Sequence, residues 1–146
     1  MLVVGLFIAA RLRDLTTHNI LQLAGSEIFG VQVARHDWDD IIAYAIKDIV
    51  HPPLFYVLLK LWISIGGESL QWIRLFPVLT SIAALVPFLL LCRELKLRAA
   101  EINLTLALMA VNAYLISNSQ GLRMYSLLLF LRLMLFVAFR QTSQSC

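Results

Sequence analysis

The sequence predicts an all-α integral membrane protein, and three observations lead to this class. Of the 146 residues, 60% are hydrophobic and only 14% are charged, whereas an average soluble domain has about 45–50% apolar and about 25% charged residues. The mean hydropathy is +0.82. The apolar residues gather in runs that short polar or basic segments separate. We therefore expect a single membrane domain over residues 1–146.

The charge and the cysteines argue against other classes of protein. A formal net charge of +3 is too small to indicate a nucleic-acid partner, which a concentrated basic surface would indicate. Cys92 and Cys146 lie far apart, a spacing that indicates neither a disulfide framework nor a metal site. No cluster of His, Asp and Glu with metal-ligand spacing occurs in the sequence.

Residues 1–12 begin with an apolar run, 1–10, that is too short to cross a bilayer. A spanning helix needs about 20 apolar residues, and basic residues follow this run from Arg11 onward. No cleavage pattern typical of a signal peptide follows it. We expect a partial spanning helix, the remaining end of a first helix whose beginning is missing.

Residues 13–70 are expected to form an outer loop with helices that lie next to the membrane. An amphipathic helix is expected at 28–34. Asp37 can cap a second helix at 38–49, because side-chain oxygens at this position accept hydrogen bonds from the first turn. Glu27 lies outside that helix start, so it is either a solvated loop acid or an acid of a site.

A proline corner interrupts this loop at His51-Pro52-Pro53. Proline lacks a backbone donor and restricts the residue before it, so the incoming helix should stop near Val50 and a new helix can start at either proline. His51 is thus either a site residue held on a rigid corner or a polar residue at the membrane surface. The following helix, 54–65, rises only about 18 Å against a hydrocarbon core of about 30 Å, so we expect it along the interface.

Spanning helices are expected at 71–92, 102–118 and 123–140. Pro77 and Pro87 fall within the first of these, and kinks are expected there. The connecting segment 93–98 holds three basic residues, so the positive-inside rule assigns it to the cytoplasm. The outer loop and the turn at 117–123 then face the extracytoplasmic side of the plasma membrane.

Three residues near this turn and the helix after it carry charge or hydrogen-bonding groups. Arg123 can bind a phosphate through two guanidinium nitrogens or extend to lipid headgroups. Tyr125 is either a ligand-binding residue or a member of the interfacial aromatic belt. Arg132 falls in the middle of the third span, where a charge costs at least about 2.5 kcal/mol. It should pair within a bundle, or this helix is not an ordinary span.

Three motifs resemble one family in order and spacing. His51-Pro52-Pro53-Leu54-Phe55-Tyr56, continuing to Trp62, resembles the HPPL[FY]Y-x-LLK-x-W stretch of bacterial and archaeal membrane glycosyltransferases. These are relatives of the dolichyl-phosphate-mannose protein mannosyltransferases and of the lipid A aminoarabinose transferase. Residues 67–77 resemble the family's G-x-S-x-x-x-x-RL-x-P segment, and 119–127 resemble its SQEARMYSL turn. The resemblance covers about residues 24–131, which correspond to the amino-terminal third or so of a typical member.

The resemblance implies the amino-terminal part of a C-type glycosyltransferase helix bundle with interfacial juxtamembrane helices. It implies transfer of a sugar from a polyprenyl-phosphate donor in the bilayer to an extracytoplasmic acceptor, which is a glycan, a lipid or a protein; no nucleic acid is involved. His51 and Arg123 would bind the donor phosphate, and Gln120 and Tyr125 would form hydrogen bonds near it. Some relatives use a divalent cation, which Glu27 could contact; no other cofactor is implied.

The positions implied to be catalytic are Ser26 and Glu27. Relatives carry an Asp-Glu pair here, whose aspartate is the general base on the acceptor hydroxyl, and base catalysis is worth about 10²–10⁴-fold. A serine cannot accept a proton near neutral pH as a carboxylate does. Glu27 could substitute, although a shift of one residue rotates a helical side chain by about 100°. The acid of the family's turn is likewise replaced, by Gly121.

Two interpretations follow from these replacements. In the first, the chain is an incomplete glycosyltransferase, truncated or frameshifted, that is inactive alone. In the second, it is a complete small membrane protein that binds polyprenyl phosphate, or a partner subunit, without chemistry.

Overall fold

The computed structural model describes residues 2–12, 25–41 and 53–144, and the predicted all-α class is confirmed for them. Helices make up 87% of these residues, and no strand occurs among them. A short helical stretch at 38–41 follows the second helix before a gap in the described residues. The labelled helices are α1 (Leu2–Leu12), α2 (Gly25–Arg35), α4 (Pro53–Gly66), α5 (Leu70–Ala83), α6 (Leu85–Glu94), α7 (Ala99–Val111), α8 (Ala113–Gln120) and α9 (Tyr125–Gln144).

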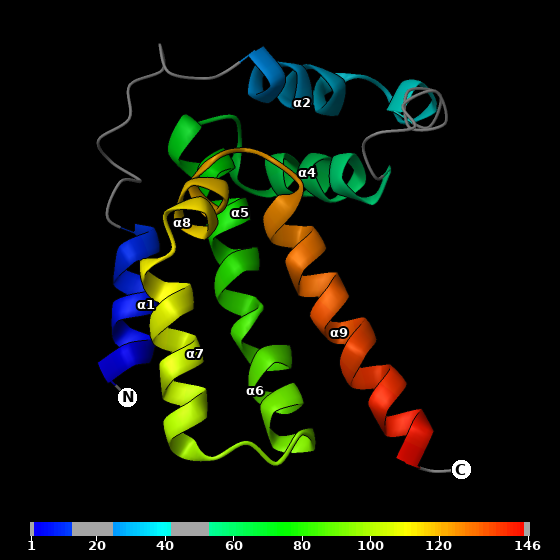
Figure 1. The fold of residues 1–146 in the computed structure, drawn as a ribbon. Coiled ribbons are helices and arrows are strands. Elements are labelled where there is room, and N and C mark those ends of the chain that lie inside the picture. Colours follow the sequence, from blue (N-terminus) through cyan, green and yellow to red (C-terminus); the bar gives the residue numbers. More distant parts are fainter. Residues whose placement is uncertain (1, 13–24, 42–52, 145–146) are drawn as a thin grey trace.

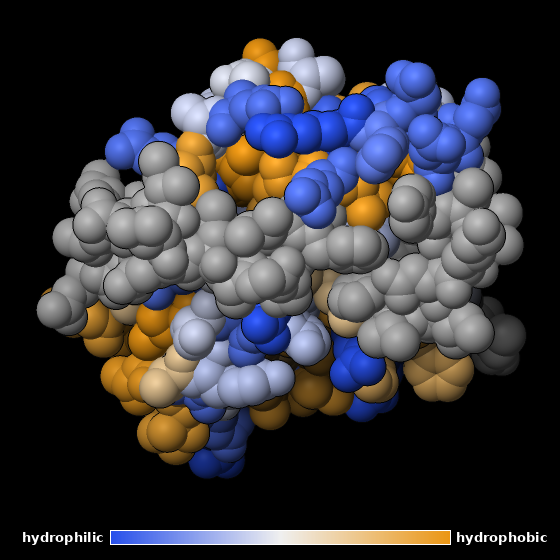
Figure 2. Space-filling view, turned by 90° about the horizontal axis from the view of Figure 1, so that it is seen from above, coloured by the Kyte–Doolittle hydropathy of each residue, from blue (hydrophilic) through white to orange (hydrophobic). Residues whose placement is uncertain are grey.

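The helices form a bundle with a layer across one end (Figure 1). α1, α5, α6, α7 and α9 run along the bundle, whereas α2 and α4 lie across the end where α9 begins. The connection between α6 and α7, which contains the basic segment 93–98, lies at the opposite end. The outer-loop helices and the turn before α9 therefore share one end, as the predicted topology requires. Seen from that end, hydrophilic residues gather beside exposed hydrophobic ones (Figure 2).

Several helices of the described chain are long and apolar enough to cross a membrane. Residues 70–94 and 125–143 meet this condition as single segments, and α7 and α8 meet it together as a bent pair. Two or three spans are therefore compatible with the predicted membrane association. The predicted helix 123–140 corresponds to α9, which begins two residues later.

The predicted helix 71–92 is divided in two in the structure. α5 ends at Ala83 and α6 begins at Leu85, although Ala84 between them keeps a helical backbone and donates its N–H to Thr80 O at 3.1 Å. The cause lies at Pro87, which has no N–H to donate to the carbonyl of Ala83 four residues earlier and whose ring crowds it. Pro77, in contrast, lies inside α5 without ending it.

The predicted helix 102–118 also differs from the structure. α7 ends at Val111, and α8 leaves it at an angle of 60°. Asn112 begins α8 as its N-cap, because its Oδ1 accepts a hydrogen bond from Leu115 N at 3.0 Å. An N-cap residue has an extended backbone, so the asparagine turns the chain where a continuous helix was expected.

The end layer is anchored to α5 through α4. α4 begins at Pro53 and ends at Gly66, and the φ of +81° at Gly67 turns the chain out of the helix. Its 14 residues rise about 21 Å. The rings of Trp62 and Trp72 stack with centroids 4.4 Å apart, and each indole N–H donates to the other residue's carbonyl, at 2.8 and 2.9 Å. α4 is thereby held across the start of α5.

Two separate apolar clusters form the described core. The end cluster lies where α2, α4, α5 and the start of α9 meet, and the bundle cluster lies between α1, α6 and α7. The end cluster contains Val33, Ala34, Ile41, Phe55, Tyr56, Leu59, Ile73, Phe76, Leu122 and Leu127. The bundle cluster contains Phe7, Leu85, Phe88, Cys92, Leu106 and Ala110.

Candidate functional site

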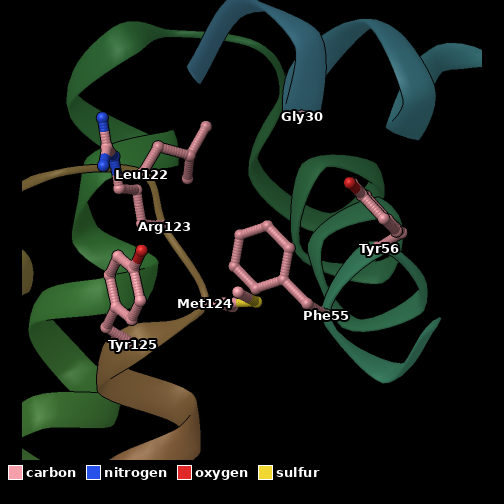
Figure 3. Close-up of a pocket in the computed structure, with 7 residues that line it drawn as sticks. All are labelled: Gly30, Phe55, Tyr56, Leu122, Arg123, Met124 and Tyr125. Carbon is pink, nitrogen blue, oxygen red and sulfur yellow. The ribbon is translucent and has the colours of Figure 1, made fainter. Parts of the chain in front are cut away.

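A small pocket opens at the edge of the end cluster (Figure 3). Its volume is ≈ 60 Å³, and segments far apart in the sequence line it. α2 contributes one residue, α4 two, and the turn into α9 the remainder. The lining residues are Gly30, Phe55, Tyr56, Leu122, Arg123, Met124 and Tyr125. The pocket therefore joins the His-Pro-Pro segment to the Gln-Gly-Leu-Arg-Met-Tyr segment.

In the turn at 121–124, the side chain of Arg123 projects outward because the neighbouring Leu122 is buried. Leu122 is 2% exposed and belongs to the end cluster. The backbone N–H of Arg123 donates to Gly121 O at 2.8 Å, which makes the turn tight. With Leu122 buried, the side chain of Arg123 is left exposed. Tyr125 follows in the first turn of α9, and its hydroxyl points toward the Arg123 side chain in Figure 3.

The guanidinium of Arg123 has no described carboxylate to neutralise it. The ion pairs among the described residues join Arg35 to Glu68, and His36 to Asp40 when the imidazole is protonated. No side-chain hydrogen bond of Arg123 occurs in the described part of the chain. In Figure 3 the Tyr125 hydroxyl lies next to the aliphatic part of the Arg123 side chain, and the guanidinium extends away from it. A guanidinium and a tyrosine hydroxyl are both donors that can bind a phosphate or carboxylate. The pocket is therefore suited to a small anionic group.

The predicted catalytic pair lies on the helix that contributes to this pocket. Ser26 and Glu27 are in the first turn of α2, about one turn before Gly30. Gly30 is close to α4, since a Cβ at this position would lie 3.9 Å from Phe55 Cε1. The side chains of Ser26 and Glu27, and the whole of His51, fall outside the described part of the structure, so their roles stay predictions.

Gln120 occupies a different place from Arg123 and Tyr125. It is the last residue of α8, and its Nε2 donates to the carbonyl of Ala10 at 3.3 Å. This contact joins α8 to α1, and Gln120 does not line the pocket with Arg123. In the described structure it connects helices, and a role near the donor phosphate stays a prediction.

Two buried arginines received no functional role from the sequence. Arg74 in α5 is 6% exposed, and its Nε makes no hydrogen bond to any described residue. Arg11 is 0% exposed, and each of its three side-chain nitrogens donates one hydrogen bond within the bundle. In the sequence, Arg74 stands in the G-x-S-x-x-x-x-RL-x-P segment at the start of an expected span. An arginine at the start of a span can equally lie at the membrane surface, so this position does not predict that the side chain is buried.

The described residues contain no group of three or more His, Cys, Asp or Glu side chains that could hold a metal ion. A divalent cation at Glu27 stays a prediction, because that side chain is outside the described part.

Comparisons of the chain with protein-family models, with curated proteins and with solved structures gave no significant match.

Proposed function

We propose that this chain binds a polyprenyl-phosphate-linked sugar at the extracytoplasmic surface of the plasma membrane, within a helix bundle of the C-type glycosyltransferase kind. The pocket of Arg123, Tyr125, Phe55 and Tyr56 carries the proposal, because two of the segments that resemble the membrane glycosyltransferases meet there. The proposed full reaction is transfer of the sugar to a glycan, lipid or protein acceptor. This chain supplies the donor-binding part of that reaction.

The size and the composition of the pocket support a phosphate as the bound group. A volume of ≈ 60 Å³ is far below the about 300–1,000 Å³ of ordinary ligand pockets, so the pocket suits the phosphate and not the sugar or the chain. Arg123 supplies the charge, and Tyr125 supplies a neutral donor. The polyprenyl chain would extend into the bilayer, beside the candidate spans.

Binding without transfer is the alternative that one observation favours. Position 26 carries a serine, and Gly121 stands where relatives have an acid. A site without the general base loses about 10²–10⁴-fold in rate. We therefore expect donor binding to be retained and sugar transfer to be absent in the purified chain.

Donor binding is tested by comparing two arginine variants that change the same charge. We expect Arg123→Gln to weaken polyprenyl monophosphate binding about tenfold or more, since hydrogen bonds to charged groups contribute about 1.5–3 kcal/mol. Arg140→Gln, an exposed arginine in the distal half of α9, is the matched control and should bind as the unchanged protein does. Native mass spectrometry in detergent, with phosphate-free polyprenol as the second ligand, measures both. Equal phosphate preference in Arg123→Gln and the unchanged protein would contradict the proposal.

Catalysis is tested with a polyprenyl-phosphate donor that carries a radiolabelled sugar. The purified chain should transfer no label to lipid, glycan or protein acceptors, because Ser26 cannot act as a base. In a protein extended to the full length of the family, Ser26→Asp should gain transfer, and Ser26→Asn, of the same size without the charge, should not. Label transfer by the unchanged chain would refute the inactive reading, and no gain in Ser26→Asp would count against assigning position 26 to the base.

A further inference from the structure

A second, larger pocket lies between α5, α8 and α9. Its volume is ≈ 350 Å³, within the range of ligand pockets, and it shares only Tyr125 with the pocket of Arg123. The 60° bend at Asn112 directs α8 away from the line of α7. The lining residues are Ser81, Tyr114, Leu115, Asn118, Tyr125, Ser126, Leu128, Leu129 and Arg132.

One face of α9 forms the longest wall of this pocket. Tyr125, Leu128, Leu129 and Arg132 follow the spacing of three, four and seven residues that places side chains on the same face of a helix. Seven residues rise about 10 Å, so the pocket extends from the end of the bundle into the candidate span. Arg132 marks its deep end, and Tyr125 marks the end that the two pockets share.

The guanidinium of Arg132 has no partner among the described residues. No hydrogen bond or ion pair joins its side chain to another residue of the described chain. No aspartate or glutamate occurs in the sequence between residues 69 and 93 or after residue 101, so α5, α8 and α9 offer no carboxylate. Arginine stays charged in proteins. Where α9 crosses a membrane, an anion other than the described carboxylates would be needed to neutralise Arg132.

The other residues that line the pocket indicate which kind of anion it can bind. Some polar groups are already engaged: Asn118 Nδ2 donates to Tyr114 O at 2.9 Å, and Ser126 Oγ donates to Asn118 O at 3.1 Å. The hydroxyls of Tyr114 and Tyr125 donate to no other described residue. Two phenols and a guanidinium beside leucine side chains match a phosphate attached to an apolar chain.

We propose that this pocket binds the phosphate of a membrane lipid, held by Arg132 with the hydroxyls of Tyr114 and Tyr125. The phosphate lies between Tyr125 and Arg132, and the apolar chain passes along Leu128 and Leu129 into the bilayer. The phosphate belongs either to a bilayer phospholipid or to a polyprenyl phosphate. This second anion site depends on α9 crossing a membrane and does not depend on the sugar-transfer proposal.

The experiment titrates the purified full chain in detergent with single lipids and counts bound copies by native mass spectrometry. The ligands are phosphatidylglycerol, polyprenyl monophosphate, and the phosphate-free diacylglycerol and polyprenol. We expect Arg132→Gln to bind at least one phosphate lipid tenfold or more weakly, and Arg140→Gln, the matched control on the same helix, to bind it unchanged. The ligand that loses affinity identifies the source of the phosphate. Tyr114→Phe, at a side chain that is 68% exposed and so unimportant for folding, should weaken the same ligand threefold or more.

Two results would overturn the inference. The first is unchanged binding of every phosphate lipid by both Arg132→Gln and Tyr114→Phe. The second is a lipid-free dimer that Arg132→Gln dissociates, which would assign the anion to a second copy of the chain. Loss of lipid binding in Arg123→Gln tests only the proposed function, because Arg123 does not line the larger pocket.

Discussion

The bundle cluster and the end cluster of this protein hold arginines in different ways. In the bundle, Arg11 lies 3.3 Å from the centroid of the Phe7 ring and is fully buried. Its Nε donates to Ser81 Oγ at 2.8 Å, and its terminal nitrogens donate to the carbonyls of Phe7 and Met109 at 3.1 and 3.5 Å. At the end cluster, Arg123 projects from a turn whose apolar neighbour is buried, and its guanidinium is exposed.

The difference separates a structural arginine from arginines that can bind a ligand. Arg11 donates hydrogen bonds to neutral oxygens of three helices, so its side chain joins α1, α5 and α7. The donors of Arg123 and Arg132 have no described acceptor, although each lines a pocket. A buried arginine is therefore not by itself evidence of a site. A binding site is indicated where a pocket lies beside a guanidinium whose N–H groups donate to no described residue.

The largest expected effect is at Arg11, and it tests the structural side of the comparison. Arg11→Ala removes the hydrogen bonds to Ser81, Phe7 and Met109, leaves buried acceptors unsatisfied and opens a cavity, which together should cost about 3 kcal/mol. Arg132→Ala, which changes the same charge at an exposed position, should cost less than about 0.5 kcal/mol. Thermal unfolding in detergent, followed by circular dichroism, measures both. A larger loss in Arg132→Ala than in Arg11→Ala would reverse the comparison.

A smaller effect is expected where the end layer meets the bundle. A Cβ at Gly66 would lie 1.9 Å from Trp72 Cε2, so Gly66→Ala must displace the stacked tryptophans. Overpacking of this kind costs about 1–3 kcal/mol. Gly5→Ala is the matched control, because a Cβ there meets nothing within 4 Å and alanine favours the helix. Tryptophan fluorescence during thermal unfolding reports the change, and equal melting temperatures in the two variants would contradict the packing argument.

Local signals in the sequence were enough to predict the start and end of α4. Pro53 begins the helix and the Gly66-Gly67 pair ends it, because each acts on its own backbone. Kinks were expected in the first span, and the break at Ala84 follows from Pro87. The bend at Asn112 was not predicted, since a single asparagine in an apolar run is a weak signal until its side chain is seen to cap α8.

Contacts between distant residues could not be predicted in this way. Arg11 and Ser81 are 70 residues apart, and periodicity states which face of a helix is apolar without stating which helix it meets. The motifs did indicate Arg123 and Tyr125 together, and both line one pocket. The G-x-S-x-x-x-x-RL-x-P motif contains Arg74 but does not predict its burial, which depends on how α5 packs. Arg132 was recognised as unusual from its position in a span, and only the structure shows that it lines a pocket.

The smallest expected effect concerns the contact that joins α2 to the segment between α4 and α5. Arg35 donates to Glu68 from two nitrogens, at 3.2 and 2.6 Å, and the side chains are 55% and 49% exposed. Exposed ion pairs contribute about 0.2–1 kcal/mol and are weakened by salt. A double-mutant cycle of Arg35→Gln and Glu68→Gln should therefore give a coupling of about 0.5 kcal/mol that decreases in 1 M salt. A coupling above about 2 kcal/mol, unchanged by salt, would show that this pair positions α2 as firmly as Arg11 joins the bundle helices.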